Sequence, residues 1–396
     1  MDALSKILAL SEAEQDARGL AHTPCEISQQ PATWQQSCQE VLRRAPELRE
    51  FLAQTGLGRG GPEQPTVLLV GAGTSDYVGR SLCALLRREW RCPVEAIPST
   101  DLLTNAEDFL VPGSRYVWIS FSRSGDSSEG VAVLESALDR YPAIQHIVIT
   151  CNARGSMARD FGGRPNLFPI VLGDEVNDRG LAMTSSFSNM VVAGQCLAHL
   201  HNAEAYATLV DLLSEAARKF LPAAADVCER LVSEGFSKVC FLGAGPLKAL
   251  AIEAGLKVLE LTAGRVVTFA ESFLGFRHGP LSAIDYDTLV VGFLSGDARR
   301  RAFELDLLRE IGDKQLTGKC LVVVPTNEGE SEALGLAKET ISLGFHQEIA
   351  DVYRPPVDVI VGQLLGLFSS LRAGLKPDAP SPRGAISRVV THVRIH

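Results

Sequence analysis

A chain of 396 residues is longer than one typical domain core, so two domains are expected. Nearly half of the residues are hydrophobic and only 6% are aromatic, a composition that favours an α/β protein rich in Ala, Leu and Val. The formal net charge of −9 argues against a general nucleic-acid-binding protein, although an acidic protein can still hold a locally positive site for a small anion.

The nine cysteines are scattered and include no Cys-x-x-Cys pair, which is typical of reduced, buried thiols in a cytoplasmic protein. The N-terminal stretch lacks a basic segment followed by a long apolar run, so no signal peptide is expected. No apolar run approaches the ~18 residues needed to cross a bilayer, and we therefore expect no membrane partner.

Residues 1 to about 60 have a helical pattern and no recognisable chemistry. Thr23 and Thr33 resemble helix starts, the first with Pro in the first turn and Glu at the third position. A Gly/Pro-rich break follows over 56–65. We expect this segment to form a helical layer that covers a sheet or a dimer surface.

The first chemistry-bearing motif follows a short apolar strand expected over 66–70. The strand leads into Gly71, Gly73, Thr74 and Ser75, and a helix is expected from about residue 77 to 89. A strand, a glycine turn and a helix start present backbone N–H groups and the positive helix end to an anion. The run lacks the third glycine of a dinucleotide site and the Gly-Lys-Ser/Thr of a Walker loop, while the two hydroxyls suggest a phosphate monoester.

A second hydroxyl-rich loop follows the strand expected over 115–120. Ser122, Ser124 and Ser127 could hold a phosphate with their hydroxyls and backbone N–H groups, and Arg123 lies among them. The alternative is that these serines only cap the next helix. In a parallel open sheet both loops lie at the carboxyl edge, where ligands bind, and this favours a site.

Two more strands are expected over 146–150 and 168–172. Thr184 and Ser185 then stand at the start of a long helix that reaches about residue 201, another hydroxyl cluster that would face an anion. An Ala-rich helical stretch from about 205 to 236 connects two halves of the chain.

The second half repeats the pattern of the first. The strand-and-loop segments 238–245, 289–297 and 320–327 correspond to 66–73, 118–126 and 147–152 at an offset of about 170 residues, which indicates a duplication. The second half lacks the hydroxyls, because Pro246 and Leu247 stand where Thr74 and Ser75 stand in the first. The first half is therefore the expected phosphate binder.

Acid–base residues gather in the stretch 251–284. Glu253, Lys257 and Glu260 have helical spacing on one face, and we expect Lys257 to pair with Glu253. The alternative is an ordinary solvated helix face. The turn 277–280, Arg-His-Gly-Pro, follows closely, and His278 near helix carboxylates would make an acid–base pair. Arg277 is expected either to offset a phosphate or to pair with Glu271, itself a candidate site residue.

A last helix is expected from residue 356 to 374. Beyond a Pro-rich stretch, residues 388–395 are expected to form a terminal strand, an arm over the site, or a frayed tail.

Together these motifs resemble the sugar isomerase (SIS) family over about residues 45 to 370. The resemblance is closest to the galactosamine-6-phosphate deaminase branch, also labelled tagatose-6-phosphate ketose/aldose isomerase. It rests on the glycine turn 71–75, the serine loop 122–127, the charged helix face and the run 271–280.

The resemblance implies tandem doubly wound α/β/α domains with parallel sheets, preceded by N-terminal helices. The expected divisions of the chain are an N-terminal helical segment over residues 1–45, SIS domains at 46–205 and 206–375, and a tail at 376–396. It implies a phosphorylated amino sugar as substrate, no metal or organic cofactor, and a homodimer or higher homo-oligomer.

The resemblance also implies roles for individual residues. Glu260 would take the C2 proton of an open-chain sugar phosphate, His278 would open the ring, and Glu253 would position the substrate. The expected substrate-binding residues are Gly73, Thr74, Ser75, Ser122, Arg123, Ser124, Ser127, Thr184, Ser185 and Glu271. Two alternatives stay open, a fructosamine-6-phosphate deglycase and a non-catalytic phosphosugar sensor.

Overall fold

The computed structural model describes residues 1–57, 64–326, 331, 333, 335–346, 348–390 and 393–396. Most of the Gly/Pro-rich break and residues 327, 391 and 392 of the expected strands lie outside these ranges. Contacts divide the chain into two compact units. The first-sheet unit comprises Ala32–Asp178, Ser185–Asp211 and Ile386–His396, and the second-sheet unit comprises Met1–Pro31, Arg179–Thr184 and Leu212–Ala385.

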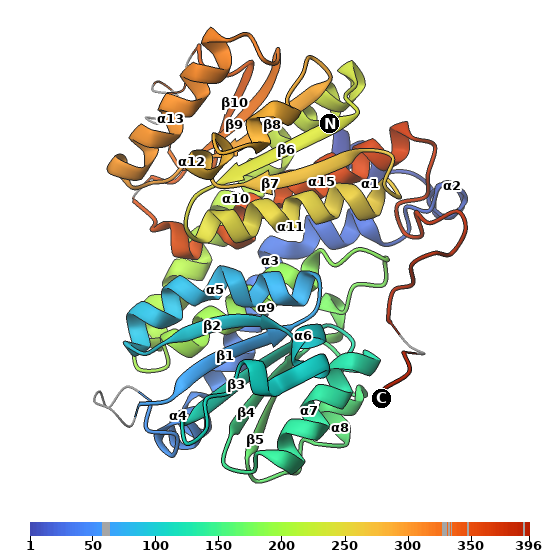
Figure 1. Ribbon diagram of the computed structural model, residues 1–396. Helices are drawn as coiled ribbons and strands as arrows, with labels where there is room; N and C mark the ends of the chain where they lie inside the picture. Colours follow the sequence, from blue (N-terminus) through green and yellow to red (C-terminus); the bar gives the residue numbers. More distant parts are fainter. Residues whose placement is uncertain (58–63, 327–330, 332, 334, 347, 391–392) are drawn as a thin grey trace. The chain divides into compact units, whose positions relative to one another are not determined.

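The first-sheet unit is built on a parallel sheet of order β2-β1-β3-β4-β5 (Figure 1). Its strands are β1 (Thr66–Gly71), β2 (Val94–Pro98), β3 (Tyr116–Ser122), β4 (Gln145–Thr150) and β5 (Leu167–Val171). Its helices are α4 (Ala45–Ala53), α5 (Thr74–Trp90), α6 (Ser99–Asn105), α7 (Ser128–Arg140), α8 (Ser156–Arg159) and α9 (Ser185–Ala198), with 3-10 turns η1 (Ala106–Asp108) and η2 (Asp174–Val176).

Both faces of this sheet are covered, because every residue of β3 is buried. Helices α5 and α9 pack together on one face, and α6 and α7 pack together on the other (Figure 1). On the α6–α7 face the core includes Leu68, Val70, Trp118 and Val133. The unit is therefore a three-layer α/β/α sandwich, as predicted.

The second-sheet unit has a parallel sheet of the same order, β7-β6-β8-β9-β10. Its strands are β6 (Lys238–Gly243), β7 (Val267–Glu271), β8 (Thr288–Phe293), β9 (Lys319–Val324) and β10 (Glu339–Ser342). Its helices are α1 (Ala3–Leu8), α2 (Glu12–Arg18), α11 (Pro246–Leu261), α12 (Phe273–Phe276), α13 (Ala298–Asp313) and α15 (Pro355–Arg372), with η3 (Pro280–Ala283) and η4 (Asp351–Tyr353). Helices α3 (Thr23–Arg43) and α10 (Ala203–Glu234) contribute residues to both units.

Helices α11 and α15 pack together against one face of the second sheet (Figure 1). On the other face, Leu242 and Val290 of the strands pack with Phe273 of α12 and Leu308 of α13. Glycines allow the close approach of α11 and α15, since a Cβ on Gly362 would lie 2.5 Å from the Cβ of Ala254.

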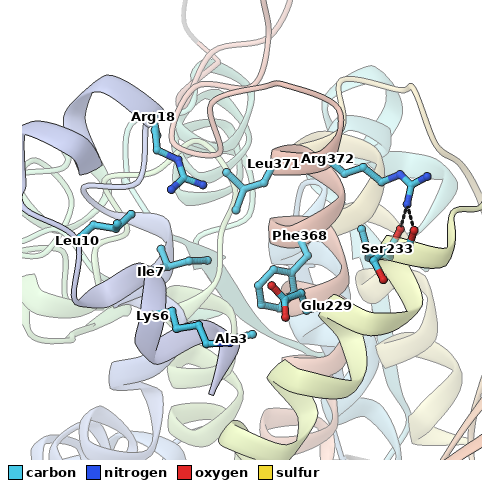
Figure 2. A pocket seen from close by; sticks show the side chains of 11 residues that line it. Ala3, Lys6, Ile7, Leu10, Arg18, Glu229, Ser233, Phe368, Leu371 and Arg372 are labelled. Carbon is cyan, nitrogen blue, oxygen red and sulfur yellow. Dashed lines mark hydrogen bonds between the residues drawn. The ribbon is translucent and has the colours of Figure 1, made fainter. Parts of the chain in front are cut away.

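Helices α1 and α2 of the N-terminal segment belong to this unit, whereas Phe51 of α4 packs on Phe168 of β5 in the first-sheet unit. Helices α1 and α2 pack beside α10 and α15, and a groove of about 480 Å³ remains between them. Figure 2 shows Ile7 and Leu10 facing Phe368 and Leu371 across it, with Arg372 bonded to backbone carbonyls of α10. None of the predicted site residues lines this groove. Within the described part of the chain, no helix is long and apolar enough to span a membrane.

Two sequence-based helix starts are wrong. Thr33 lies inside α3, which continues through Pro31. Proline has no N–H for the carbonyl of Ile27, and this carbonyl accepts the Gln30 side-chain amide instead, at 2.9 Å. Helix α5 begins at Thr74 rather than Tyr77, because Gly73 caps it directly. Thr74 and Ser75 therefore stand in the first turn of the helix.

Candidate active site

The glycine turn after β1 depends on backbone geometry that only glycine adopts easily. Gly73, the N-cap of α5, has φ 55° and ψ −125°. A Cβ on Gly71 would lie 2.4 Å from the backbone of Ser75, so this position also requires glycine. Apart from its neighbours along the chain, no atom of the described residues would lie within 4 Å of an added Cβ on Gly73. The turn therefore offers an uncovered helix start, with the buried Thr74 and Ser75 in its first turn.

The serine loop after β3 is held by its own hydroxyls. Ser122 Oγ accepts a hydrogen bond from Gly125 N at 3.0 Å, and Ser124 Oγ accepts one from Asp126 N at 3.2 Å. Ser127 is the N-cap residue of α7, and its side chain makes no capping hydrogen bond. The alternative that these serines only cap the next helix therefore does not explain the Ser127 side chain.

The C-terminal tail lies against this loop in the first-sheet unit. Ser128 N donates to Val390 O at 3.1 Å, and the buried Arg123 donates to Arg388 O. Arg388 in turn donates through Nε to Asp178 O at 2.6 Å and through Nη2 to Asn177 Oδ1 at 2.7 Å. The described tail residues form an irregular arm and not the terminal strand that was one of the expectations. Because residues 388 and 390 make these hydrogen bonds, this part of the tail is not frayed.

The start of helix α9, at Thr184 and Ser185, binds a carboxylate from the same chain. The Asp178 carboxylate accepts from Ser185 N at 3.0 Å and from Ser186 N at 2.8 Å. Thr184 and Ser185 are both completely buried. The predicted anion at this helix start is thus a buried carboxylate, which satisfies the backbone donors in place of a ligand.

The charged residues of α11 form a compact cluster, which we call the α11 triad: Glu253, Lys257 and Glu260. Lys257 Nζ lies 3.2 Å from Glu253 Oε1 and 2.7 Å from Glu260 Oε2. Glu253 and Lys257 are completely buried, whereas the Glu260 side chain is 25% exposed. The predicted Glu253–Lys257 pair is confirmed, and the alternative of a solvated helix face is wrong.

The ammonium of Lys257 is stabilised although it is buried. Burial alone would lower its pKa, but the Glu253 and Glu260 carboxylates outweigh burial and raise the pKa of Lys257 above its ordinary value. Lys257 therefore stays charged at neutral pH. It neutralises much of the charge of two carboxylates and leaves Glu260 as the member that reaches solvent.

Glu271 lies at the opposite end of α11 from Glu260. It is the last residue of β7 and forms an ion pair with Lys248 in the first turn of α11. Lys248 and Glu260 are twelve residues apart, which corresponds to roughly 18 Å along a helix. The structure therefore does not bring Glu271 to the α11 triad.

The turn that holds His278 follows α12. The expected Arg277–Glu271 pair is wrong, because Arg277 Nε lies 2.6 Å from Glu310 Oε2 on α13. His278 is exposed, and Gly279 turns the chain with φ 125° before η3. This arrangement presents the imidazole to solvent and leaves Arg277 engaged in an ion pair.

Known proteins of similar sequence are full-length matches. A protein named putative D-galactosamine-6-phosphate deaminase AgaS from Streptomyces coelicolor is 36% identical over 377 residues, 95% of each chain. The D-galactosamine-6-phosphate deaminase AgaS of Escherichia coli O157:H7 is 34% identical over 372 residues, 94% of each chain. This chain belongs to the AgaS family. No family model matched the sequence.

Solved structures agree with the assignment to the AgaS family. The structure of a putative tagatose-6-phosphate ketose/aldose isomerase from Clostridium novyi superposes with a TM-score of 0.90 at 32% identity, over 98% of both chains. This AgaS-family chain therefore has the tandem SIS architecture that the motifs predicted.

Three contacts of this AgaS-family chain had no signal in the sequence. Asp178 fills the helix start of α9, Lys248 holds Glu271, and Arg388 ties the tail to the loop before α9. Asp178 and Lys248 are single charged residues near turns, and their partners are seven or more residues away. The expectation of a strand, an arm or a frayed tail over 388–395 did not indicate these partners of Arg388.

Proposed function

We propose that this chain is a phosphosugar deaminase that converts galactosamine-6-phosphate and water into tagatose-6-phosphate and ammonia. The observation that carries the proposal is the α11 triad, in which buried Lys257 orients the partly exposed Glu260. The names of full-length relatives support the same substrate. The experiment below separates this activity from its alternatives.

Glu260 is the base in this proposal. Its Oε2 is held by Lys257 at 2.7 Å, and its Oε1 has no hydrogen-bond partner among the residues that the structure describes. One carboxylate oxygen is thus fixed and the other is left to accept a proton. Removal of the C2 proton next to an aldehyde places negative charge on the C1 oxygen, and this charge must be stabilised by hydrogen-bond donors.

Ring opening precedes this step, and His278 is its proposed acid–base group. An exposed imidazole can move a proton between the ring oxygen and the C1 hydroxyl. Glu253 serves as a positioning residue, because it is buried and acts through Lys257. Glu271 was also predicted to bind the substrate, but it pairs with Lys248 at the other end of α11 from Glu260.

The phosphate of the substrate is proposed to bind the first-sheet unit. The supporting features are the uncovered Gly73 turn with Thr74 and Ser75, and the loop of Ser122, Arg123, Ser124 and Ser127. Thr184 and Ser185, also predicted to bind the substrate, are completely buried at the start of α9, where Asp178 accepts from the backbone N–H groups. Hydroxyls and helix-start N–H groups are the donors that a phosphate monoester needs.

The reaction balances without any added reagent except water. The C2–H bond breaks, its electrons form a C1–C2 double bond, and reprotonation at C1 gives a ketimine at C2. Water then adds to C2, the C–N bond breaks, and ammonia leaves the ketose phosphate. An aldose without the amine would give only isomerisation by the same proton shuttle.

We further propose a homodimer or higher homo-oligomer in the cytoplasm, with the two SIS domains derived by internal duplication. The exposed His278 supports a site that a second copy covers. The nine free cysteines support a reducing compartment. The identical strand order of the two sheets supports the duplication. Domain boundaries at 45/46, 205/206 and 375/376 stay a prediction.

The test is ammonia release by the purified protein, with galactosamine-6-phosphate and glucosamine-6-phosphate supplied separately. Release that prefers the galacto sugar supports the proposal. Release from neither sugar, with phosphosugars still raising the thermal midpoint, would replace it by a deglycase or a phosphosugar sensor. Fructosamine-6-phosphate as a third substrate then separates these two.

A further inference from the structure

The loop after β8 in the second-sheet unit corresponds to the serine loop after β3. Both strands occupy the central position of their sheets, beside β6 and β1 respectively. The loop carries Ser295, Gly296 and Asp297 and leads into α13. Loops at this point of an open parallel sheet are where ligands bind.

The carboxylate of Asp351 lies in this loop like a bound anion. Its Oδ1 accepts from Gly296 N at 2.8 Å and from Arg354 Nη1 at 3.0 Å. Its Oδ2 accepts from Arg300 Nη1 at 2.7 Å and from the hydroxyl of Ser295. A backbone N–H, a hydroxyl and two guanidinium groups are the donor set of an oxyanion site.

The donors around Asp351 keep it charged in a buried position. Burial alone would raise its pKa, but Arg354 and the hydrogen bonds from Ser295 and Gly296 lower the pKa of Asp351 below its ordinary value. Arg354 is completely buried and also pairs with Asp358 at 2.8 Å. The arginine therefore keeps one carboxylate partner if Asp351 is removed.

The adjacent glycine turn is covered in this unit. Gly245 has φ 58° and ψ −126°, nearly the same conformation as Gly73 in the first-sheet unit. An added Cβ on Gly245 would lie 3.3 Å from the Arg300 guanidinium carbon, whereas one on Gly73 would meet nothing within 4 Å. Arg300 thus lies over the turn and links it to Asp351.

We propose that the second-sheet unit contains an oxyanion site that the Asp351 carboxylate fills as an internal ligand, with Arg300 covering the neighbouring glycine turn. The site would accept a tetrahedral oxyanion such as inorganic phosphate once the carboxylate is removed. It follows, if the proposed function holds, that the phosphate of the substrate binds only through the open loops of the first-sheet unit. The Asp351 carboxylate thereby prevents a second substrate molecule from binding at the loop after β8.

The test compares Asp351→Ala with Asp351→Asn. Both variants remove the charge, but only alanine vacates the volume of the carboxylate. Phosphate binding is measured by titration calorimetry at constant ionic strength in chloride. We expect Asp351→Ala to bind one phosphate more per chain than the wild type, and Asp351→Asn to match the wild type. Equal stoichiometry in all three proteins would overturn the proposal.

Thermal unfolding in phosphate gives a second readout. Phosphate should raise the midpoint of Asp351→Ala by several degrees more than that of the wild type or of Asp351→Asn, because a ligand that binds only the folded state stabilises it. A variant that folds only when phosphate or sulfate is present would also support the site. Equal midpoint shifts in all three proteins would contradict it.

Arg300→Gln keeps the proposal testable if Asp351→Ala does not fold in any buffer. This variant uncovers the Gly245 turn but leaves the internal carboxylate in place. It should bind the same number of phosphates as the wild type, and an extra phosphate would show that Asp351 does not fill the site. Ammonia release from galactosamine-6-phosphate, measured on the same preparations, separates failure of this proposal from failure of the proposed function.

Discussion

The ammonium of Lys257 lies 2.7 Å from Glu260 Oε2, and the lysine is completely buried while the glutamate is 25% exposed. An ion pair between a buried lysine and a partly exposed glutamate adds little to the stability of the fold, since the cost of desolvation offsets much of the attraction between the charges. It fixes the orientation of one carboxylate at the surface of α11, and this is what a positioned base requires.

Replacing Lys257 with methionine should destabilise the protein by about 3–5 kcal/mol, because it leaves Glu253 buried without its cation. Chemical unfolding measures the change. Lys219→Met is the matched control, since Lys219 pairs with Glu215 at 2.6 Å on a helix surface where both side chains are about 60% exposed. The control should unfold close to the wild type. A Lys257→Met midpoint as high as that of Lys219→Met would contradict the account.

The carboxyl group of Glu304 makes the stability of the folded state depend on pH. Burial raises the pKa of Glu304 from its ordinary 4.5 to about 7, so the folded state binds this proton more tightly than the unfolded state. The stability that this proton contributes is present below pH 4.5 and is lost as the pH rises to about 7. Arg300, Arg354 and Asp351 are the charges that face the group.

Glu304→Gln keeps an acceptor for Ser295 N, whose bond to Glu304 is 2.7 Å, but cannot ionise. The free energy of unfolding of the variant, measured relative to that of the wild type, should rise by about 2–3 kcal/mol between pH 5 and pH 8. This figure follows from the rule of about 1.4 kcal/mol per pKa unit. Guanidinium unfolding at the two pH values measures the difference. A constant difference between the proteins at both pH values would rule out the elevated pKa.

Gly73→Ala should cost about 1–3 kcal/mol of stability, because its φ of 55° and ψ of −125° are strained for a residue with a Cβ. It should also weaken the protection by phosphosugars against thermal unfolding. Gly163→Ala is the control, since its added Cβ likewise meets nothing within 4 Å and its φ is not positive. If both variants behave alike, the Gly73 turn is not the constrained anion site described above.

His278→Asn should lower kcat for galactosamine-6-phosphate by about 10²-fold or more, the share of a general acid–base group in ring opening. Its unfolding midpoint should not change, because the side chain is exposed. His201→Asn, at another exposed histidine, should leave both quantities unchanged. Full activity in His278→Asn would remove this residue from the mechanism.

Much of the fold followed from apolar runs. Strands buried on both faces, such as β3 and β8, read as continuous hydrophobic stretches and were predicted closely. The edge strand β7 was missed, because its residues are all at least partly exposed and lack such a run. The parallel, doubly wound sheets were implied by the family resemblance, but the strand order was not predicted, since pairing between distant strands is not visible in local patterns.

The site was predictable where spacing along one helix decided it. The i, i+4 and i+7 spacing of Glu253, Lys257 and Glu260 put them on one face, although spacing did not reveal that the face is buried. Pairs between distant elements, such as Glu271 with Lys248, depend on how β7 packs on α11. The anion at Ser185 was expected to be a ligand and is Asp178, because a helix start attracts an internal carboxylate as readily.

The most direct measurement of the central claim is the fate of the C2 hydrogen. Galactosamine-6-phosphate deuterated at C2 is incubated with the wild type and with Glu260→Gln, which keeps the size and one acceptor of the side chain. We expect the wild type to release ammonia and to move the deuterium from C2 to water or to C1 of tagatose-6-phosphate. Glu260→Gln should be slower by about 10²–10⁴-fold in both. Ammonia release at the wild-type rate by Glu260→Gln would contradict the assignment of Glu260 as the base.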